Sequence, residues 1–314
     1  MDPDRRPDPR PDDLDLALRA ALAGAELGLA YFARVQGLAR DHKVDGSVVT
    51  EADLAVEEEV RRVLLAARPD DAFLGEETGE LGAGDRRWIL DGIDGTLVFV
   101  EGDDRWQTLI ALEEDGEVTV GVAILPAQGQ VWYAARGRGA FVADVVGGRV
   151  TADRPLRAGG PPESLRASRT AVLPPVAMMP ERYHAEVDRL VRAVEVADWR
   201  VHGALLVASG ELDLAVQVGG KVWDYAPLSL IVTEAGGVFG GDDGRPHPVA
   251  GTGVFAGHEV TAAAARDVLG DVGTPGTYPG TDAFPTMERT ASDPALRARR
   301  PVVGHPAAAT RRSS

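Results

Sequence analysis

The stretch from residue 88 to residue 96, Trp-Ile-Leu-Asp-Gly-Ile-Asp-Gly-Thr, constrains the fold of this chain more than any other. Its apolar start is typical of a buried β-strand, which we predict to end at Leu90. Asp91 and Asp94 follow on a glycine-flanked turn, where both carboxylates can face one cation. Gly95-Thr96 then begins a predicted helix, whose free N–H groups suit a phosphate. The stretch therefore predicts metal-assisted phosphate chemistry.

The composition is that of a soluble globular protein. The 314 residues, 44% hydrophobic and 26% charged, suffice for one large domain or two small ones. A formal net charge of −16 argues against a nucleic-acid polymer as partner, because binding its backbone needs an excess of Lys and Arg. The absence of cysteine excludes thiol nucleophiles and zinc–thiolate sites, whereas Asp and Glu favour Mg²⁺. No apolar run approaches about 18 residues and no signal peptide is evident, so we expect a cytoplasmic protein without a membrane segment.

Periodicity separates a folded region, residues 14–269, from two ends that we predict to be disordered, residues 1–13 and 270–314. Apolar residues at helical spacing predict helices over 14–40, 52–67, 181–196, 204–209 and 225–235. Short apolar segments between turn residues predict strands over 73–77, 108–113, 117–125, 130–135, 140–145, 198–202 and 213–218. The four segments between residues 108 and 145 indicate an antiparallel meander.

Three separated segments place carboxylates at the end of an apolar run: Glu76-Glu77, Asp91 with Asp94, and Asp224. Each segment alone is also typical of a solvated turn or, for Asp224, of a helix N-cap. Their occurrence together with a Gly-Thr helix start favours one shared metal site over three unrelated turns.

These motifs resemble those of the inositol monophosphatase family, the lithium-sensitive, metal-dependent phosphatases. The family motif Asp-Pro-Ile-Asp-Gly-Thr corresponds to residues 91–96, with Gly92 in place of the proline. The Trp-Asp motif corresponds to Trp223-Asp224, and Glu-Ala-Gly-Gly follows at residues 234–237. The chain therefore resembles the family in both halves of its folded region.

Two upstream elements extend the resemblance, Gly-Glu-Glu at residues 75–77 and Thr-x-x-Asp at residues 50–53, so that it covers about residues 14–260. It implies an α+β fold, a layered α/β/α/β/α sandwich. An N-terminal metal-binding half (14–150) would face a C-terminal substrate half (151–269). The resemblance also implies a homodimer that acts on a small phosphorylated metabolite.

The resemblance implies a ligand set for two or three Mg²⁺ ions. Glu76, Asp91 and the backbone carbonyl of Ile93 would bind one ion. Asp91, Asp94 and Asp224 would bind a second, so that Asp91 bridges the two. Glu76 is accordingly also a candidate catalytic residue.

The same resemblance implies how phosphate and water are held. The N–H groups of Gly95 and Thr96 would bind phosphate oxygens, which the helix dipole favours. A water molecule on the metal would be oriented by Thr96 and Asp53, the candidate catalytic pair. Thr50 and Lys43 would support this arrangement. No covalent intermediate is implied, because metal binding itself lowers the pKa of the water.

The segments 87–91, 106–112 and 134–141 are most similar to the histidinol-phosphatase branch of the family, which implies L-histidinol phosphate as substrate. His202, Gln217 and Asp224 are the candidate substrate-binding side chains. For His202 an ordinary polar or core role is the competing interpretation.

Three departures favour other substrates. Val98 stands where the family has Asn, and the segment 199–205 is about four residues shorter than in the family. Gln217 stands where relatives often have a substrate-binding Glu, which weakens recognition of an amine. Inositol 1-phosphate, or another sugar or cyclitol phosphate, is the alternative substrate. A non-catalytic relative that acts as a binding module is the alternative from another functional class.

Overall fold

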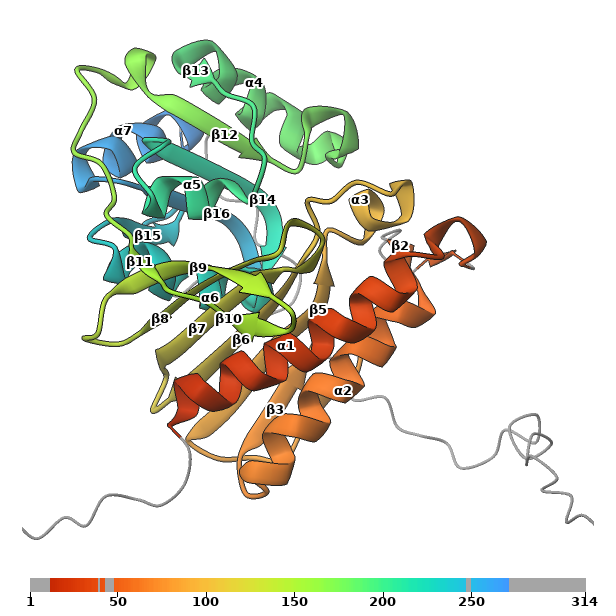
Figure 1. The fold of residues 1–314 in the computed structure, drawn as a ribbon. Coiled ribbons are helices and arrows are strands. Elements are labelled where there is room, and N and C mark those ends of the chain that lie inside the picture. The colour runs from red at the N-terminus through yellow and green to blue at the C-terminus, as the bar shows by residue number, and fades with distance from the viewer. Residues whose placement is uncertain (1–11, 39, 43–47, 247–249, 271–314) are drawn as a thin grey trace, which may run out of the picture. The chain divides into compact units, whose positions relative to one another are not determined.

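The structure, a computed structural model, describes residues 12–38, 40–42, 48–246 and 250–270 (Figure 1). These residues all belong to one compact unit. The predicted disordered segments 1–11 and 271–314, and Lys43, lie outside the described residues. Asp12, Asp13 and Gly270 were predicted to be disordered, and this is wrong: Asp12 caps the first helix, Asp13 begins it, and Gly270 ends the last. The division of the folded region at residue 150 stays a prediction.

A large, mainly antiparallel sheet occupies the chain between residues 72 and 155. Its order is β10-β9-β8-β7-β6-β5-β3-β4, with β11 beside β9, and only β3 and β5 pair in parallel. The strands are β3 (Ala72–Gly75), β4 (Gly79–Leu81), β5 (Arg86–Asp94), β6 (Gln107–Glu114), β7 (Glu117–Leu125), β8 (Gln130–Ala135), β9 (Ala140–Val146), β10 (Arg149–Val150) and β11 (Arg154–Pro155). The predicted meander is confirmed by β6 to β9.

A smaller, mixed sheet follows in the order β13-β12-β14-β16-β15. Its strands are β12 (Arg169–Leu173), β13 (Glu195–Val196), β14 (Leu214–Lys221), β15 (Val238–Gly241) and β16 (Ala250–Ala256). β12 is parallel to β13 and β14, whereas β16 is antiparallel to its neighbours. A two-stranded ribbon, β1 (Asp41–His42) with β2 (Val48–Val49), lies apart from both sheets.

The helices lie in layers around the two sheets (Figure 1). They are α1 (Asp13–Phe32), α2 (Glu51–Ala67), α3 (Thr96–Glu101), α4 (His184–Ala193), α5 (Gly203–Ala208), α6 (Val222–Glu234) and α7 (Glu259–Gly270). One apolar core joins α1 and α2 to the large sheet, a second packs α5 and α6 between the sheets, and a third joins α4 and α7 to the small sheet. Strand side chains alternate between cores, as Trp88 and Ile89 do. The predicted α/β/α/β/α sandwich is confirmed.

Several element boundaries differ from the prediction because tertiary pairing overrides local pattern. β5 does not end at Leu90 but continues to Asp94, where it still pairs with β6. The predicted helix 181–196 begins as a 3₁₀ turn over Glu181–Tyr183 and continues as α4, but it ends at Ala193 because Glu195 and Val196 pair with β12 as β13. The segment 198–202 is not a strand, and the first helix stops at Phe32 before a 3₁₀ turn. Within the described residues, no helix combines the length and apolar character needed to cross a membrane.

Candidate metal centre

A bulge in β5 brings the two aspartates of the first motif onto one side of the sheet. Asp91 pairs with Leu109 and Asp94 pairs with Gln107, so two residues of β5 lie opposite Thr108 alone. In a regular strand, side chains three residues apart point to opposite faces, and the extra residue cancels this alternation. The Thr108 hydroxyl donates to the carbonyl of Gly92 at 2.7 Å and holds the bulge. The predicted turn is therefore a bulged strand.

Asp224 completes a group of three carboxylates with Asp91 and Asp94. One carboxylate oxygen from each lies within 4.8 Å of the other two. Asp224 is in the first turn of α6, where its Oδ2 accepts from the backbone N–H of Lys221 at 2.5 Å. This confirms its predicted position at a helix start, although at the third helical residue rather than the N-cap. Residues 130 positions apart in the chain thus meet at one point.

Glu76 lies beside this group, at the end of β3. Its backbone N–H donates to the carbonyl of Leu90 on the parallel neighbour β5, at 3.1 Å. Its side chain is within hydrogen-bonding reach of Asp91. The four carboxylates that the sequence predicts to meet are therefore brought together, since Glu76, Asp94 and Asp224 all act on the charge of Asp91.

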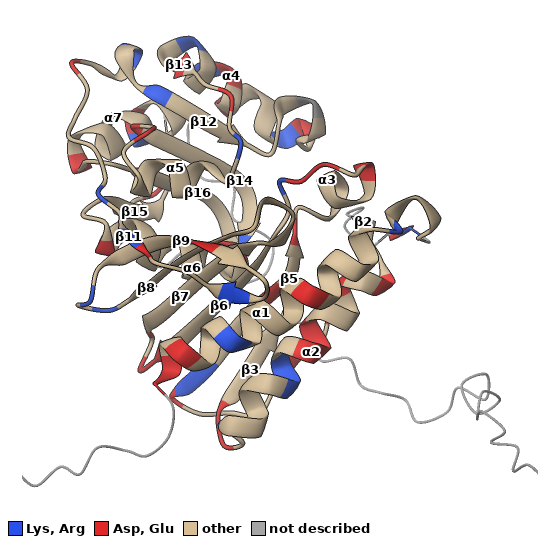
Figure 2. Ribbon diagram, in the orientation of Figure 1, with Lys and Arg blue, Asp and Glu red and all other residues tan. Residues whose placement is uncertain are grey.

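The electrostatics of the group favour a cation. Burial, followed by repulsion from neighbouring carboxylates, raises the pKa of Asp91 and of Asp224 well above the usual range. Burial raises the pKa of Asp94 to about 6, although the Gln107 amide, which donates to Asp94 Oδ2 at 2.7 Å, opposes the shift. Because Asp91, Asp94 and Asp224 offer only oxygen ligands, which burial desolvates, they fit a hard divalent cation such as Mg²⁺. Figure 2 shows acidic segments at this end of β5 and on α2.

The predicted catalytic pair lies next to the carboxylates. The Thr96 hydroxyl donates to Asp53 Oδ1 at 2.8 Å and also reaches the carbonyl of Ile93 at 3.2 Å. The other oxygen of Asp53 accepts from the backbone N–H and the hydroxyl of Thr50, at 2.9 and 2.7 Å. These bonds form a capping box at the start of α2, so a local helix signal also fixes the pair. Burial raises the pKa of Asp53.

Gly95 turns the chain from β5 into α3. Its φ of 87° lies in the left-handed region, which an L-residue with a side chain adopts only with strain. Its backbone N–H interacts with the carboxylate of Asp94 and lowers the pKa of that carboxyl group. The N–H group of Gly95, which is predicted to bind phosphate, therefore points toward the site, where it interacts with the carboxylate of Asp94.

The structure brings His202 and Gln217, two of the predicted substrate-binding residues, together, and their side chains form a hydrogen bond with each other. His202 Nδ1 accepts from the N–H of Ala204 at 3.1 Å and caps α5, so the neutral ring carries its proton on Nε2. That proton is shared with Gln217 Oε1 at 3.1 Å. Both residues are buried, and burial lowers the pKa of His202 to about 4. Their role in substrate binding stays a prediction.

Two residues at the site were missed in the sequence. Gln107 bonds Asp94, and nothing in its local pattern indicates that contact. Glu57 is completely buried on α2, in the apolar stripe that includes Val56 and Val60. A charged residue inside a predicted apolar stripe is a signal that could have identified it.

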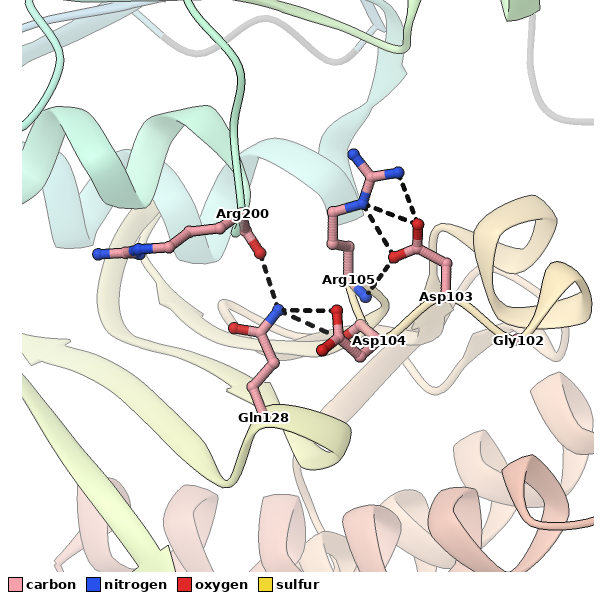
Figure 3. Close-up of a pocket in the computed structure, with 6 residues that line it drawn as sticks. All are labelled: Gly102, Asp103, Asp104, Arg105, Gln128 and Arg200. Carbon is pink, nitrogen blue, oxygen red and sulfur yellow. Dashed lines mark hydrogen bonds and ion pairs between the residues drawn. The ribbon is translucent and has the colours of Figure 1, made fainter.

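A hollow of about 780 Å³ lies beside the loop that follows α3, and Figure 3 shows the residues around it. They are Gly102, Asp103, Asp104, Arg105, Gln128 and Arg200. Gln128 Nε2 donates to the carbonyl of Arg200 at 2.8 Å, and the Arg105 guanidinium lies 4.6 Å from the ring centre of Trp199. The hollow thus lies between the loop after α3 and the segment that contains Arg200.

Comparisons with known proteins agree with this fold, which belongs to a class of layered α+β phosphatases. The model of the inositol monophosphatase family matches residues 12–270, and the chain belongs to this family. A structure of the extragenic suppressor protein SuhB from Bartonella henselae superposes with a TM-score of 0.71 at 26% identity, covering 83% of this chain and 99% of that one. The resemblance inferred from the motifs is confirmed.

Three curated relatives carry three different names. A Streptomyces griseus protein named glucose-1-phosphate thymidylyltransferase is 43% identical, over 72% of this chain and 84% of its own length. A histidinol-phosphatase of Mycobacterium tuberculosis is 39% identical over 77% and 92%, respectively. An inositol-1-monophosphatase of Rhizobium meliloti is 32% identical over 82% and 95%. The family is therefore established, whereas the names of the relatives differ in substrate and, for the Streptomyces griseus protein, also in reaction.

Proposed function

We propose that this phosphatase is a Mg²⁺-dependent phosphomonoesterase that hydrolyses a small phosphate ester with metal-activated water. The group formed by Asp91, Asp94 and Asp224 is the observation that carries the proposal. Three carboxylates so close together, one buried and two half-buried, repel one another, and divalent cations relieve that repulsion. Bound Mg²⁺ would neutralise charge on the phosphoryl group and lower the pKa of a water ligand.

The ligands that we propose are those implied by the family motifs. Glu76, Asp91 and the carbonyl of Ile93 would hold one ion, and Asp91 with Asp94 and Asp224 a second. The contact between Glu76 and Asp91 supports this sharing, because a carboxylate that neighbours Glu76 as well as Asp94 and Asp224 can bridge two cations. Two or three ions per site are proposed.

Asp53 and Thr96 would orient the attacking water. Because the Thr96 hydroxyl donates its proton to Asp53, its oxygen lone pairs remain to accept a proton from a water molecule. Asp53 is itself fixed by its hydrogen bond with Thr50, so the Thr96 hydroxyl cannot rotate without losing its hydrogen bond to Asp53. The N–H groups of Gly95 and Thr96 would bind phosphate oxygens once cations occupy the carboxylates.

We propose L-histidinol phosphate as the first substrate to test and inositol 1-phosphate as the second. The first is supported by the histidinol-phosphatase relative, which matches over 92% of its length. The second is supported by the inositol-1-monophosphatase relative and by Gln217. The neutral amide of Gln217 attracts the ammonium group of a substrate less strongly than a carboxylate would. The Streptomyces griseus relative adds glucose 1-phosphate to the esters to be compared.

One assay separates these readings. Phosphate release from the three esters is measured with Mg²⁺, and glucose 1-phosphate is also incubated with dTTP to detect pyrophosphate. Preferential release from one ester identifies the substrate class. Pyrophosphate without phosphate release would contradict a phosphatase, and no turnover in any arm would favour the non-catalytic binding module.

We also propose that the chain forms a homodimer, as the family resemblance implies. Light scattering of the purified chain would test this.

A further inference from the structure

Glu57 is a buried carboxylate whose bonding partners all belong to one turn. It lies on α2, one helical turn after Asp53, and its side chain is inaccessible to solvent. It accepts from the backbone N–H of Glu77 at 2.9 Å, from that of Thr78 at 2.7 Å and from the Thr78 hydroxyl. A buried carboxylate is costly unless donors surround it, and here the turn between β3 and β4 supplies them.

The turn approaches this carboxylate so closely that it excludes a side chain at Gly75. A Cβ at that position would lie 1.9 Å from Glu57 Oε1. Gly75 therefore permits the contact that Glu57 makes with the next residues of the turn. The close approach and the three hydrogen bonds define a fixed distance between α2 and the end of β3.

Glu76 lies between the two anchored points. Its own N–H is held by the carbonyl of Leu90 on β5, and the N–H of the following residue is held by Glu57. Fixing the backbone on both sides of a residue fixes the direction of its Cα–Cβ bond. The direction in which Glu76 leaves the turn is thus set jointly by β5 and α2.

We propose that Glu57 is a positioning residue for the metal ligand Glu76, so that divalent-ion affinity depends on a side chain that contacts no ion. The proposal rests on the proposed function for the ligand role of Glu76. Residues that orient metal ligands commonly change metal affinity by about 10- to 100-fold when replaced. Glu57→Gln keeps the shape of the side chain, but its amide N–H₂ group opposes N–H donors of the turn.

The test is calorimetric titration of the apo protein with Mn²⁺, which needs no substrate. We expect Glu57→Gln to weaken Mn²⁺ binding at least tenfold, and Glu58→Gln, an exposed neighbour on the same helix, to leave it unchanged. In a Glu76→Gln background the same substitution at Glu57 should have no further effect. An effect of Glu57→Gln that persists in that background, or unchanged affinity in the single variant, would overturn the proposal.

Two further variants keep the test decisive. Thr78→Val removes only the hydroxyl donor and serves if Glu57→Gln does not fold; it should also weaken Mn²⁺ binding, and unchanged affinity would count against the proposal. Glu76→Gln alone tests the proposed function. Wild-type affinity in Glu76→Gln would refute the ligand role, whereas reduced affinity there with normal affinity in Glu57→Gln would refute only the positioning role.

Discussion

Replacing Gly92 by alanine should destabilise the fold at the metal centre. An added Cβ would lie 2.7 Å from the backbone oxygen of Asp53 and 3.1 Å from the backbone nitrogen of Glu57. Both atoms belong to the main chain of α2, so neither can rotate away as a side chain would. The proline of the family motif would bring a Cβ to the same place, so α2 packs here more closely than a proline would allow.

The magnitude follows from two opposed terms. Overpacking a filled site costs about 1–3 kcal/mol, and contact with rigid backbone places Gly92→Ala near the upper end. Loss of glycine entropy in the unfolded chain offsets about 0.4–1 kcal/mol. A net loss of about 2 kcal/mol corresponds to a Tm lower by about 4–8 °C for a domain of this size.

Thermal unfolding followed by circular dichroism measures this effect. Gly160→Ala is the matched control, because no atom lies within 4 Å of a Cβ at that exposed position. Phosphatase activity should also fall in Gly92→Ala, because pushing α2 away from β5 separates Asp53 from Thr96. A Gly92→Ala protein that melts at or above the temperature of Gly160→Ala would refute the reasoning.

Three other predictions concern the site and its surroundings. Asp94→Asn should lower turnover by orders of magnitude with an unchanged far-ultraviolet spectrum, since it removes one of three convergent carboxylates; wild-type rates would exclude Asp94 from the metal site. Because burial lowers the pKa of His202 to about 4, the unfolded chain binds a proton between about pH 6.5 and 4 that the folded chain does not. The free energy of unfolding should thus decrease by about 3 kcal/mol as pH falls through this window. Urea titrations should show a weaker pH dependence of this free energy in His202→Asn than in the wild type; equal pH dependence in the two proteins would contradict the prediction. Mg²⁺ at about 100 times its Kd should stabilise the EDTA-treated protein by about 2.7 kcal/mol, and an unchanged Tm would contradict Mg²⁺ binding to the folded protein.

Local signals in the sequence were sufficient for several elements. Thr50 and Asp53 form the capping box that starts α2, and Arg68-Pro69 ends the helix as predicted. The short apolar segments between residues 107 and 146 pair as successive antiparallel strands. These elements are determined by residues that are near one another in the chain.

The details of the site depend on partners that are distant in sequence. The Asp-Gly-Ile-Asp stretch has the composition of a turn, yet pairing with β6 and the hydroxyl of Thr108 keep it in the sheet. His202 is hydrogen-bonded to Gln217, a residue of β14 that lies fifteen positions further along the chain. Such contacts are set by how the layers pack, and no local pattern predicts them.

The convergence of acidic groups also required the fold. The resemblance to the family motifs predicts Glu76, Asp91, Asp94 and Asp224 as ligands, but local pattern alone permits three separate turns or caps. Parallel pairing of β3 with β5 and the packing of α6 against β5 bring them together. The sequence predicted which residues meet, and the structure shows how the elements carry them there.

The most direct test of the account is a crystal of the protein soaked with Mn²⁺ and measured at the manganese absorption edge. We predict an anomalous peak among Asp91, Asp94 and Asp224, within direct coordination distance of a carboxylate oxygen of each, and a second beside Glu76. Ordered carboxylates with no anomalous peak between them would contradict the central claim that these residues form a divalent-metal centre.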